Sequence, residues 1–233
     1  MAHPLIEQAK RIAVLSGAGI SAESGIATFR GKDGLWKNYR PEELATPQAF
    51  DRNPELVWEW YAMRLNIVLS AKPNQAHYLL ANLEKEKDLT LVTQNVDRLH
   101  HRAGSANVLE LHGNISHSRC LQCGHLSLLE KDFSYPPLCK VCGGRTRPNV
   151  VWFGETLPVS IFQKSIHAFE SCDLALIIGT SAVVEPAASL ARLAKNKGAK
   201  VIEINPQTTS LSHLSDLSIR AGAAKGLQEL LNN

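Results

Sequence analysis

The sequence predicts an α/β protein that combines a doubly wound parallel sheet with a smaller lobe. Short apolar runs, of the kind that are buried on both faces of a parallel sheet, recur along the chain, and helical stretches such as residues 187–196 lie between most of them. Two Cys-x2-Cys motifs interrupt this alternation and predict a metal-folded module outside the sheet. The apolar runs occupy residues 12–15, 89–92, 108–111, 174–178 and 201–204.

The composition excludes several classes of protein. With 233 residues, the chain is long enough for one large domain, or for one domain and a small lobe. A net charge of +3, with Lys and Arg scattered along the chain, argues against nucleic acid as a partner but suits an anionic cofactor. No apolar run approaches the ~20 residues that span a bilayer, so we expect no membrane partner. The first residues lack the features of a signal peptide, which predicts a cytoplasmic protein.

Small and polar residues follow all five predicted strands. In an open α/β sheet, ligands bind at the edge formed by the carboxyl ends of the strands, so we expect the binding site there. Strand ends are often polar for structural reasons alone, but five ends that carry Asn, Gln, His, Thr and Ser favour a functional explanation. These ends are Ser16-Gly17-Ala18-Gly19, Thr93-Gln94-Asn95, His112-Gly113, Gly179-Thr180-Ser181 and Asn205-Pro206.

The first of these ends contains a dinucleotide-binding signature, because residues 17–22 fit G-x-G-x-x-G/A between a predicted strand and a predicted helix. Glycines let the backbone approach a pyrophosphate, and a helix N-terminus would face its charge. A tight turn without a ligand is the structural alternative. In place of a second strand ending in an acidic residue, the chain enters a glycine-rich loop at residues 25–34. This departure indicates NAD binding without hydride transfer.

The two cysteine pairs are separated by 15 residues, a spacing at which two short knuckles close a tetrahedral thiolate site around one Zn²⁺. Because all four ligands would be cysteine, no position remains for water, and we expect a structural zinc. Two disulfides are the alternative, but they suit a secreted protein. Cys172, just before an apolar run, is expected to be a buried core thiol. The predicted zinc ligands are Cys120, Cys123, Cys139 and Cys142.

Eight motifs follow one another along the chain and together resemble the sirtuins, the NAD-dependent protein-lysine deacylases. The resemblance covers nearly the whole chain. The family pattern often has Asp where this chain has Thr28, a difference that points to a subgroup. The motifs are Gly17-Ala18-Gly19-Ile20-Ser21, Gly25-Ile26-Ala27-Thr28-Phe29-Arg30, Thr93-Gln94-Asn95-Val96-Asp97, Leu111-His112-Gly113, the four cysteines, Phe153-Gly154-Glu155, Gly179-Thr180-Ser181 and Asn205-Pro206.

The resemblance implies a single catalytic core over residues 1–233. It divides this core into a Rossmann-like large lobe and a small lobe made of a helical insert and the zinc module. The large lobe would comprise residues 1–33, 73–115 and 150–233, the helical insert residues 34–72, and the zinc module residues 116–149.

The resemblance also implies the reaction. The acyl oxygen of a modified lysine attacks the ribose carbon that carries nicotinamide, nicotinamide leaves, and an imidate joins the substrate to ADP-ribose. A histidine then acts as general base on a ribose hydroxyl, and water completes the release of free lysine and O-acyl-ADP-ribose. NAD is therefore the expected co-substrate, and acylated-lysine proteins or peptides are the expected partners.

The family assigns His112 and Asn95 to catalysis, with His112 as the base, a role that imidazole suits because it titrates near neutral pH. Asn95 and Asp97 would hold the nicotinamide ribose and carboxamide. Phe29 would cover the nicotinamide side, and Arg30 would contact the phosphates. The implied NAD-binding residues are Gly17, Ala18, Gly19, Ser21, Phe29, Arg30, Gln94, Asn95, Val96, Asp97, Gly179, Thr180, Ser181, Asn205 and Ala223.

The implied substrate-binding residues are Phe153, Val183, Tyr61 and Arg64. Phe153 and Val183 stand in sequences that resemble the family's two extended segments, between which substrate backbone adds as a strand. Tyr61 and Arg64 belong to a helix predicted from Pro54 to about residue 69, with Asn53 as its N-cap. Its predicted apolar stripe is Val57, Trp60, Tyr61, Ile67 and Val68.

Arg64 falls inside this stripe, and a guanidinium on an inward face needs an anion. Tyr61-x-x-Arg64 resembles the pair with which some sirtuins bind the distal carboxylate of succinyl and malonyl groups. We therefore expect removal of these acyl groups as well as acetyl. The alternative is that Arg64 lies along the helix edge and reaches water, or pairs with a nearby Glu.

Four other functions remain open at the level of sequence. An acetyl-only deacetylase and a protein mono-ADP-ribosyltransferase would use the same site. A non-catalytic sensor of NAD or ADP-ribose would need no base, so the joint presence of His112, Asn95 and Asp97 argues against it. A zinc-dependent nucleic-acid module would require a concentrated basic patch, which the sequence lacks.

Overall fold

The computed structural model describes residues 2–28 and 40–232, so the predictions for Phe29 and Arg30 lie outside the described residues. Within these ranges, six strands form one parallel sheet in the order β3-β2-β1-β7-β8-β9. The five predicted strands are confirmed, whereas β9 was missed because it is short and only partly buried. The strands are β1 (Arg11–Ser16), β2 (Asp88–Thr93), β3 (Val108–Glu110), β7 (Leu174–Ile178), β8 (Lys200–Ile204) and β9 (Leu217–Ile219).

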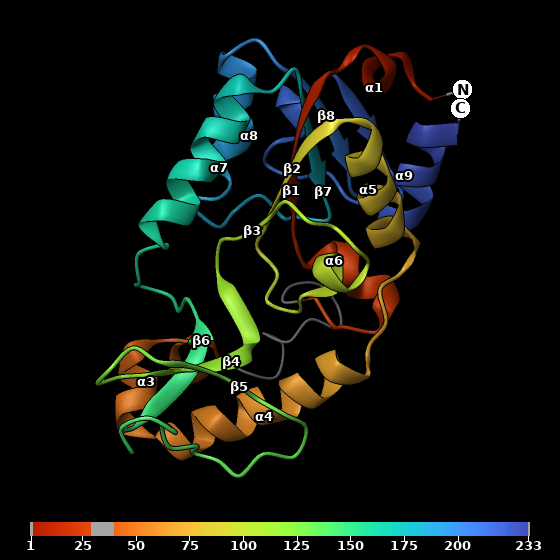
Figure 1. Cartoon of the computed structure of the whole chain (residues 1–233). Helices are drawn as coiled ribbons and strands as arrows, with labels where there is room; N and C mark the ends of the chain where they lie inside the picture. The colour runs from red at the N-terminus through yellow and green to blue at the C-terminus, as the bar shows by residue number, and fades with distance from the viewer. Residues whose placement is uncertain (1, 29–39, 233) are drawn as a thin grey trace.

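Helices cover both faces of this sheet, as Figure 1 shows. Side chains alternate between two hydrophobic clusters: in β1, Ile12 and Val14 pack into one cluster, while Ala13 and Leu15 pack into the other. The first cluster includes α1 (Pro4–Gln8), α5 (Gln75–Glu86) and α9 (Ala223–Asn232); the second includes α7 (Val159–Ser171) and α8 (Ser189–Asn196). The doubly wound architecture is therefore confirmed.

The chain reverses its direction of travel across the sheet at β1. It first runs outward from β1 through β2 to β3 and later returns on the other side of β1 as β7, β8 and β9. The adjacent carboxyl ends of β1 and β7 thus form a topological switch point, where the loops diverge and leave room for a ligand.

A second, antiparallel sheet with the order β5-β4-β6 lies below the parallel sheet in Figure 1. Its strands are β4 (Gly113–Cys120), β5 (Leu126–Leu128) and β6 (Thr146–Val150). Helices α2 (Pro41–Leu44), α3 (Pro47–Arg52) and α4 (Pro54–Ser70) share a third hydrophobic cluster with this sheet, which includes Phe50, Trp58, Ile115 and Trp152. This small lobe therefore has a core of its own.

Helix α4 begins as predicted, with the Asn53 side chain accepting a hydrogen bond from the Leu56 N–H at 3.0 Å and Pro54 in the first turn. The predicted apolar stripe is wrong at Ile67, which is 45% exposed. Trp58 and Leu65, outside that stripe, are fully buried. The reason is that α4 packs on α2 and α3 as well as on β4 and β6, so it is covered on more than one side.

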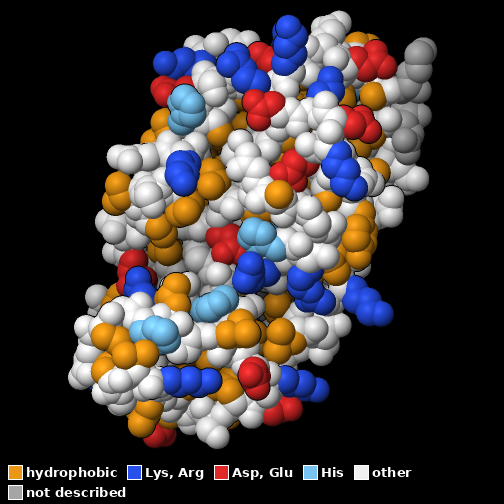
Figure 2. Space-filling model, viewed as in Figure 1, with side chains coloured by type: hydrophobic (Ala, Val, Ile, Leu, Met, Phe, Trp, Pro, Cys, Tyr) orange, Lys and Arg blue, Asp and Glu red, His pale blue; other side chains and the backbone are white. Residues whose placement is uncertain are grey.

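The remaining elements are short. A 3₁₀ helix, η1 (Ala18–Ser24), follows β1; α6 (Leu99–Arg102) follows β2; and η3 (Ser212–Leu214) precedes β9. None of the described helices is long and apolar enough to span a bilayer. On the face drawn in Figure 2, Lys and Arg are interspersed with Asp and Glu.

Two histidines are buried between α5 and α6. The rings of His77 and His100 meet edge to face with their centroids 4.9 Å apart. The Nδ1 atom of His77 accepts a hydrogen bond from the Asn74 N–H at the start of α5, so the neutral ring is the form that fits. Burial lowers the pKa of His77 to about 4 and that of His100 well below its ordinary value. Both rings are therefore neutral in the folded protein at pH 7.

This pair predicts acid sensitivity of the fold. Because the unfolded chain binds a proton at His77 below about pH 6.5 and the folded chain does not until about pH 4, stability is complete above pH 6.5 and falls as the pH drops. At pH 5, His77 alone should reduce the free energy of unfolding by about 2 kcal/mol. Urea denaturation at pH 7.5 and pH 5 should show this loss, and His77→Gln, which keeps a capping acceptor, should reduce it. Equal pH dependence in both proteins would contradict the assignment.

Candidate active site

A cleft of about 610 Å³ lies at the carboxyl edge of the parallel sheet and is also lined by residues of the small lobe. This volume is typical of cofactor sites, which occupy about 300–1,000 Å³. Of the predicted NAD-binding, catalytic and substrate-binding residues that the structure describes, Ser21, Asp97 and Val183 do not line it, although Val184 does. Those that do are Gly17, Ala18, Gly19, Tyr61, Arg64, Gln94, Asn95, Val96, His112, Phe153, Gly179, Thr180, Ser181, Asn205 and Ala223.

The glycines at the switch point hold two strand-end loops against each other. A Cβ atom on Gly17 would lie 2.8 Å from Cα of Thr180, one on Gly19 would lie 2.8 Å from Cα of Gly179, and one on Gly179 would lie 2.5 Å from N of Ile20. The Gly19 N–H also donates to the Gly179 carbonyl at 2.8 Å. The sequence suggested that these glycines admit a pyrophosphate; the structure shows that packing of the two loops itself requires them.

The segment after the glycine motif differs from the predicted helix. It is the 3₁₀ helix η1, which begins at Ala18 inside the motif, ends at Ser24 and is followed by the C-cap Gly25, where φ is +82°. Seven residues are unusually many for a 3₁₀ helix, and Ile20 and Ser21 within it are buried. The Asn74 side chain fixes it from α5 by donating to the Ile20 carbonyl at 2.8 Å and to Ser24 Oγ at 3.0 Å.

A buried polar network supports the wall of the cleft. Asn95 Nδ2 donates to the Gly17 carbonyl at 3.1 Å and to Ser21 Oγ at 3.2 Å, and the Ser21 hydroxyl donates to Asp97 Oδ2 at 2.7 Å. Burial raises the pKa of Asp97, against the opposing effect of hydrogen bonds from the Leu99 N–H and Ser21. Ser21 and Asp97 therefore act behind Asn95, which lines the cleft.

His112 lies at the junction of the two sheets, and its Nδ1 atom is 2.9 Å from the Gln94 carbonyl oxygen. A carbonyl oxygen can only accept a hydrogen bond, so Nδ1 carries the proton and Nε2 of the neutral ring is left as the base. Burial lowers the pKa of His112, against the opposing effect of this hydrogen bond. The ring is consequently neutral and able to accept a proton at pH 7.

Polar side chains also join neighbouring strand ends across the cleft floor. Gln94 Nε2 donates to Thr180 Oγ1 at 3.0 Å, and Asn205 Nδ2 donates to the Thr180 carbonyl at 2.9 Å. The ends of β2, β7 and β8 are thereby held in one arrangement. These contacts bring together side chains that the sequence placed on separate strands.

Glu203, which the sequence analysis did not identify, holds the loop at residues 206–209 that lines part of the cleft. It is buried on β8 and accepts hydrogen bonds from Thr209, from the Ser212 hydroxyl at 2.6 Å and from Arg220 Nη1 at 2.6 Å. Burial alone would raise the pKa of Glu203, but these hydrogen bonds outweigh it and lower the pKa. An acidic residue inside the apolar run of residues 201–204 was the available signal.

Tyr61 and Arg64 face the cleft from α4, and both are buried. The Arg64 guanidinium lies 4.5 Å from the centroid of the Trp60 ring and 5.6 Å from that of Tyr61. Burial lowers the pKa of Arg64, against the opposing effects of Tyr61 and Asp97. The alternative in which Arg64 extends along the helix edge to water is therefore wrong, because only 8% of the residue is exposed.

The sequence analysis did not predict the contacts that join three further residues of the small lobe. Arg147 on β6 forms a bidentate ion pair with Glu155, and its guanidinium lies 3.5 Å from the centroid of the Trp152 ring. Trp152 and Glu155 line the cleft, whereas Arg147 lies behind them. The expected extended segment at Phe153 is instead a turn, in which the Glu155 N–H donates to the Trp152 carbonyl at 3.1 Å.

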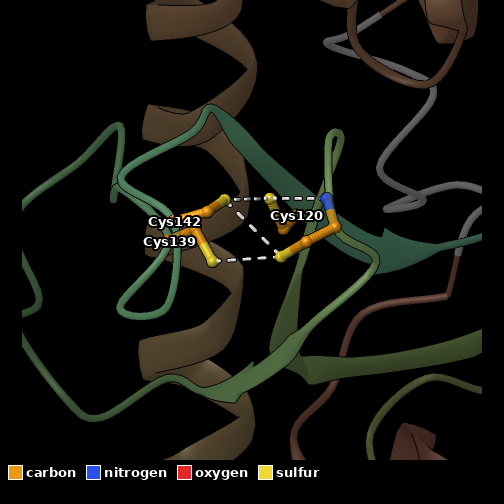
Figure 3. A group of neighbouring side chains, drawn as sticks. Cys120, Cys139 and Cys142 are labelled. Carbon is orange, nitrogen blue, oxygen red and sulfur yellow. Dashed lines mark hydrogen bonds between the residues drawn. The ribbon is translucent and has the colours of Figure 1, made fainter.

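The four cysteines of the Cys-x2-Cys motifs meet at the end of the small sheet, with their sulfur atoms directed toward one another (Figure 3). The Sγ atoms of Cys123 lie 3.6 Å from Cys139 and 3.5 Å from Cys142, and that of Cys142 lies 3.5 Å from Cys120. A tetrahedral Zn–S₄ centre with bonds of about 2.3 Å has S···S edges of about 3.8 Å, so the cluster fits one zinc ion.

The local chemistry of the cluster also suits zinc. Backbone N–H groups of Gln122 and Cys123 donate to Cys120 Sγ at 3.4 Å. The Cys123 N–H is the main reason that the pKa of Cys120 falls to about 6, which favours the thiolate, whereas the neighbouring thiols raise the pKa of Cys142 to about 12. All five cysteines are free thiols, so the disulfide alternative is wrong. No cysteine of the cluster lines the cleft, so a zinc ion bound there would have a structural role.

Comparisons with known proteins agree with this architecture. The model of the Sir2 family matches residues 17–186. An NAD-dependent protein deacylase from Thermus thermophilus is 53% identical over 235 residues, which cover 99% of this chain and 92% of that protein. NAD-dependent protein deacylase 1 from Archaeoglobus fulgidus is 50% identical over 231 residues, covering 98% of this chain and 94% of that protein.

Two solved structures illustrate the similarity in three dimensions. A complex of a Sir2 homologue with NAD superimposes with a TM-score of 0.92 at 50% identity, covering 98% of this chain and 90% of that one. A complex of Sir2 with a p53 peptide and NAD⁺ has a TM-score of 0.88 at 33% identity, covering 97% of this chain and 94% of that one.

Removal of zinc should unfold the small lobe, because a structural zinc contributes on the order of 10 kcal/mol to the folding of small modules. Loss of tertiary signal from Trp58 and Trp152, which pack in that lobe, should accompany chelation, and added zinc should restore it. Far-UV and near-UV circular dichroism with metal analysis measures both. A zinc-free protein that stays fully folded would refute a structural role.

Proposed function

This chain belongs to the Sir2 family and is an NAD-dependent protein deacylase, and we propose that it removes succinyl and malonyl as well as acetyl groups from protein lysine side chains. The observation that carries this proposal is the placement of Tyr61 and Arg64 in the cleft that also contains His112. The products would be nicotinamide, O-acyl-ADP-ribose and free lysine. The peptide in the Sir2–p53 peptide–NAD⁺ complex supports a protein substrate for this chain as well.

The cleft suggests how NAD is oriented. The strand order separates two parts of its lining: the loop at residues 206–209 follows β8, whereas Asn95 follows β2 and His112 follows β3, on the other side of β1 and β7. We place adenosine beside the loop at residues 206–209, the phosphates against the switch-point loops, and the nicotinamide ribose near Asn95. When bound, NAD supplies an electrophilic ribose carbon with nicotinamide as its leaving group.

His112 is suited to act as the general base on a ribose hydroxyl. Its Nδ1–H is committed to the Gln94 carbonyl at 2.9 Å, which orients the ring and leaves Nε2 to accept a proton. The lowered pKa keeps Nε2 unprotonated at neutral pH. Asn95, held by Gly17 and Ser21, would position the ribose that His112 acts upon.

The acyl group would enter between the two lobes, toward Tyr61 and Arg64. A buried guanidinium is costly to desolvate, and a carboxylate is the group that compensates this cost most fully. The guanidinium lies close to the aromatic rings of Trp60 and Tyr61, and its planar shape suits bidentate binding of a carboxylate. An acetyl group can occupy the same space but offers no distal carboxylate, which explains why both substrates are expected.

Phe153 and Val183 are both exposed, at 44% and 55%, on segments that flank or adjoin the cleft. Exposed apolar side chains beside a catalytic cleft are suited to contact a peptide, and we assign them to the substrate backbone on either side of the acylated lysine. Such contacts would select for an extended peptide with little dependence on its sequence.

The proposal is tested by incubating the protein with NAD and two peptides that differ only in carrying acetyl-lysine or succinyl-lysine, followed by mass spectrometry. NAD-dependent removal of succinyl at least as fast as acetyl is the expected result. Removal of acetyl alone would make the chain an acetyl-only deacetylase. ADP-ribose attached to protein instead of O-acyl-ADP-ribose would indicate an ADP-ribosyltransferase, and NAD binding without turnover would indicate a sensor.

Replacement of the base should strongly reduce deacylation of both substrates. His112→Ala should lower kcat by about 10²–10⁴-fold, the usual contribution of a general base. In the unaltered protein, kcat should rise with pH as His112 loses its proton and level off below pH 6.5, because burial lowers its pKa. His167→Ala, at an exposed position on α7, serves as the control. An acid limb centred above pH 7 would contradict this assignment.

Removal of the guanidinium should affect desuccinylation much more than deacetylation. Losing the partner of a buried carboxylate costs about 2–5 kcal/mol, so Arg64→Met should reduce desuccinylation by tens- to thousands-fold and largely preserve deacetylation. Arg64→Lys keeps the positive charge but cannot bind a carboxylate through two parallel hydrogen bonds, so it should retain more desuccinylation than Arg64→Met. Steady-state kinetics on the two matched peptides measures this ratio, and equal loss on both would refute the role of Arg64.

A further inference from the structure

The Tyr61 hydroxyl accepts a hydrogen bond within the described part of the protein but donates none to it. Its hydroxyl oxygen lies 2.9 Å from Nε1 of Trp152. The indole nitrogen can only donate, so the Tyr61 oxygen is the acceptor, and the hydrogen of the hydroxyl must point elsewhere. Within residues 2–28 and 40–232, no protein group accepts a hydrogen bond from this hydroxyl. Burial raises the pKa of Tyr61, so the phenol keeps its hydrogen at neutral pH.

Trp152 itself is held on three sides. The Arg147 guanidinium stacks on its ring, and the Glu155 carboxylate accepts a hydrogen bond from its backbone N–H at 2.8 Å. Phe50 packs against the ring with a centroid distance of 5.3 Å. Only 3% of Trp152 is exposed, so the indole cannot change rotamer without disturbing the core of the small lobe.

The ion pair between Arg147 and Glu155, behind Trp152, is held by several hydrogen bonds. Glu155 accepts two hydrogen bonds from Arg147, and Arg147 Nη2 also donates to the Val150 carbonyl at 2.9 Å. Burial alone would raise the pKa of Glu155, but the hydrogen bonds from Arg147 and the Trp152 N–H lower it, which keeps the carboxylate ionised. A bidentate pair of this kind fixes direction as well as distance.

We propose that Trp152, clamped by Arg147 and Glu155, is a positioning residue that directs the hydroxyl hydrogen of Tyr61 into the cleft, toward an oxygen at the distal end of the acyl group. This inference rests on the proposed activity toward acidic acyl groups, in which Tyr61 and Arg64 bind the distal carboxylate, and adds to that pair a residue that orients the Tyr61 hydroxyl. Trp152 acts through Tyr61 and need not touch the distal oxygen.

The arrangement favours acyl chains that carry a distal acceptor. A carboxylate can accept from the Tyr61 hydroxyl and from Arg64 together, since both line the same cleft. An acetyl group ends before such an oxygen and leaves the Tyr61 hydrogen without that partner. A buried donor that loses its acceptor discriminates strongly between otherwise similar substrates.

We call the hydrogen-bonded chain from the Trp152 indole through the Tyr61 hydroxyl to the distal oxygen the relay. A double-mutant cycle with Trp152→Phe and Tyr61→Phe tests it, using kcat and KM for the succinyl-lysine and acetyl-lysine peptides. Tyr61→Phe should lower the succinyl-to-acetyl ratio of kcat/KM by about tenfold, as expected for a hydrogen bond to a charged group. Trp152→Phe should lower the ratio by about fivefold, mainly through KM for the succinyl peptide. The double variant should match Tyr61→Phe within about twofold, since Trp152 has no effect without the hydroxyl.

Two further variants separate positioning from general stability. Arg147→Lys, behind the cleft, should shift the ratio in the same direction as Trp152→Phe because a Lys cannot form the bidentate pair. Trp58→Phe is the matched control: its Nε1 donates to the Thr146 carbonyl at 3.2 Å in the same lobe, and it does not line the cleft. This control should lower the melting temperature without changing the ratio.

The outcomes distinguish the two proposals. If the unaltered protein does not remove succinyl, the proposed acidic-acyl activity fails and the relay falls with it. The relay is overturned, while the activity stands, if the protein removes succinyl but the double variant lowers the succinyl-to-acetyl ratio by the product of the two single-variant losses. It is also overturned if Trp152→Phe lowers kcat/KM equally for both substrates. A changed ratio in Trp58→Phe would also overturn it, because a generic packing effect would then explain the data.

Discussion

The contact between the loops that follow β1 and β7 is the constraint on which the rest of the site depends. Gly17 and Gly19 on one loop meet Gly179 and Thr180 on the other so closely that no Cβ atom fits between them. This approach places the carboxyl ends of the two central strands side by side, at the point where the sheet changes direction. The cleft, the Asn95 network and the bridge from Gln94 to Thr180 are all arranged around it.

Two separate cores then set the chemistry that faces this edge. The clusters on the faces of the parallel sheet determine where the strand ends lie, whereas the cluster of the small lobe determines the orientation of α4 and of Trp152. The four clustered cysteines lie in the small lobe and take no part in lining the cleft. A zinc ion held there would therefore act on the site only through the folding of the lobe, since the cleft is lined by side chains from both lobes and by none of the four cysteines.

Much of the fold could be predicted because the controlling interactions are local or periodic. Apolar runs of four or five residues identify buried strands, since each residue there packs on one face of the sheet or the other. The knuckle spacing identifies a thiolate site because ligand geometry restricts it. The cap at Asn53 was predictable for the same reason: its hydrogen bond spans three residues. Strand β9 escaped because three partly buried residues carry little periodic signal.

The sequence by itself thus determined the parallel sheet, its functional edge, the zinc ligands and the presence of an Arg on the inner face of α4. Only the tertiary structure decided which side chains share an environment. It buried Trp58 and exposed Ile67, because α4 is covered on more than one side. It paired Trp152 with Tyr61 across 91 residues of sequence and surrounded Glu203 with donors from a later loop. Such pairings depend on how separate elements dock, and no local pattern in either partner encodes the position of the other.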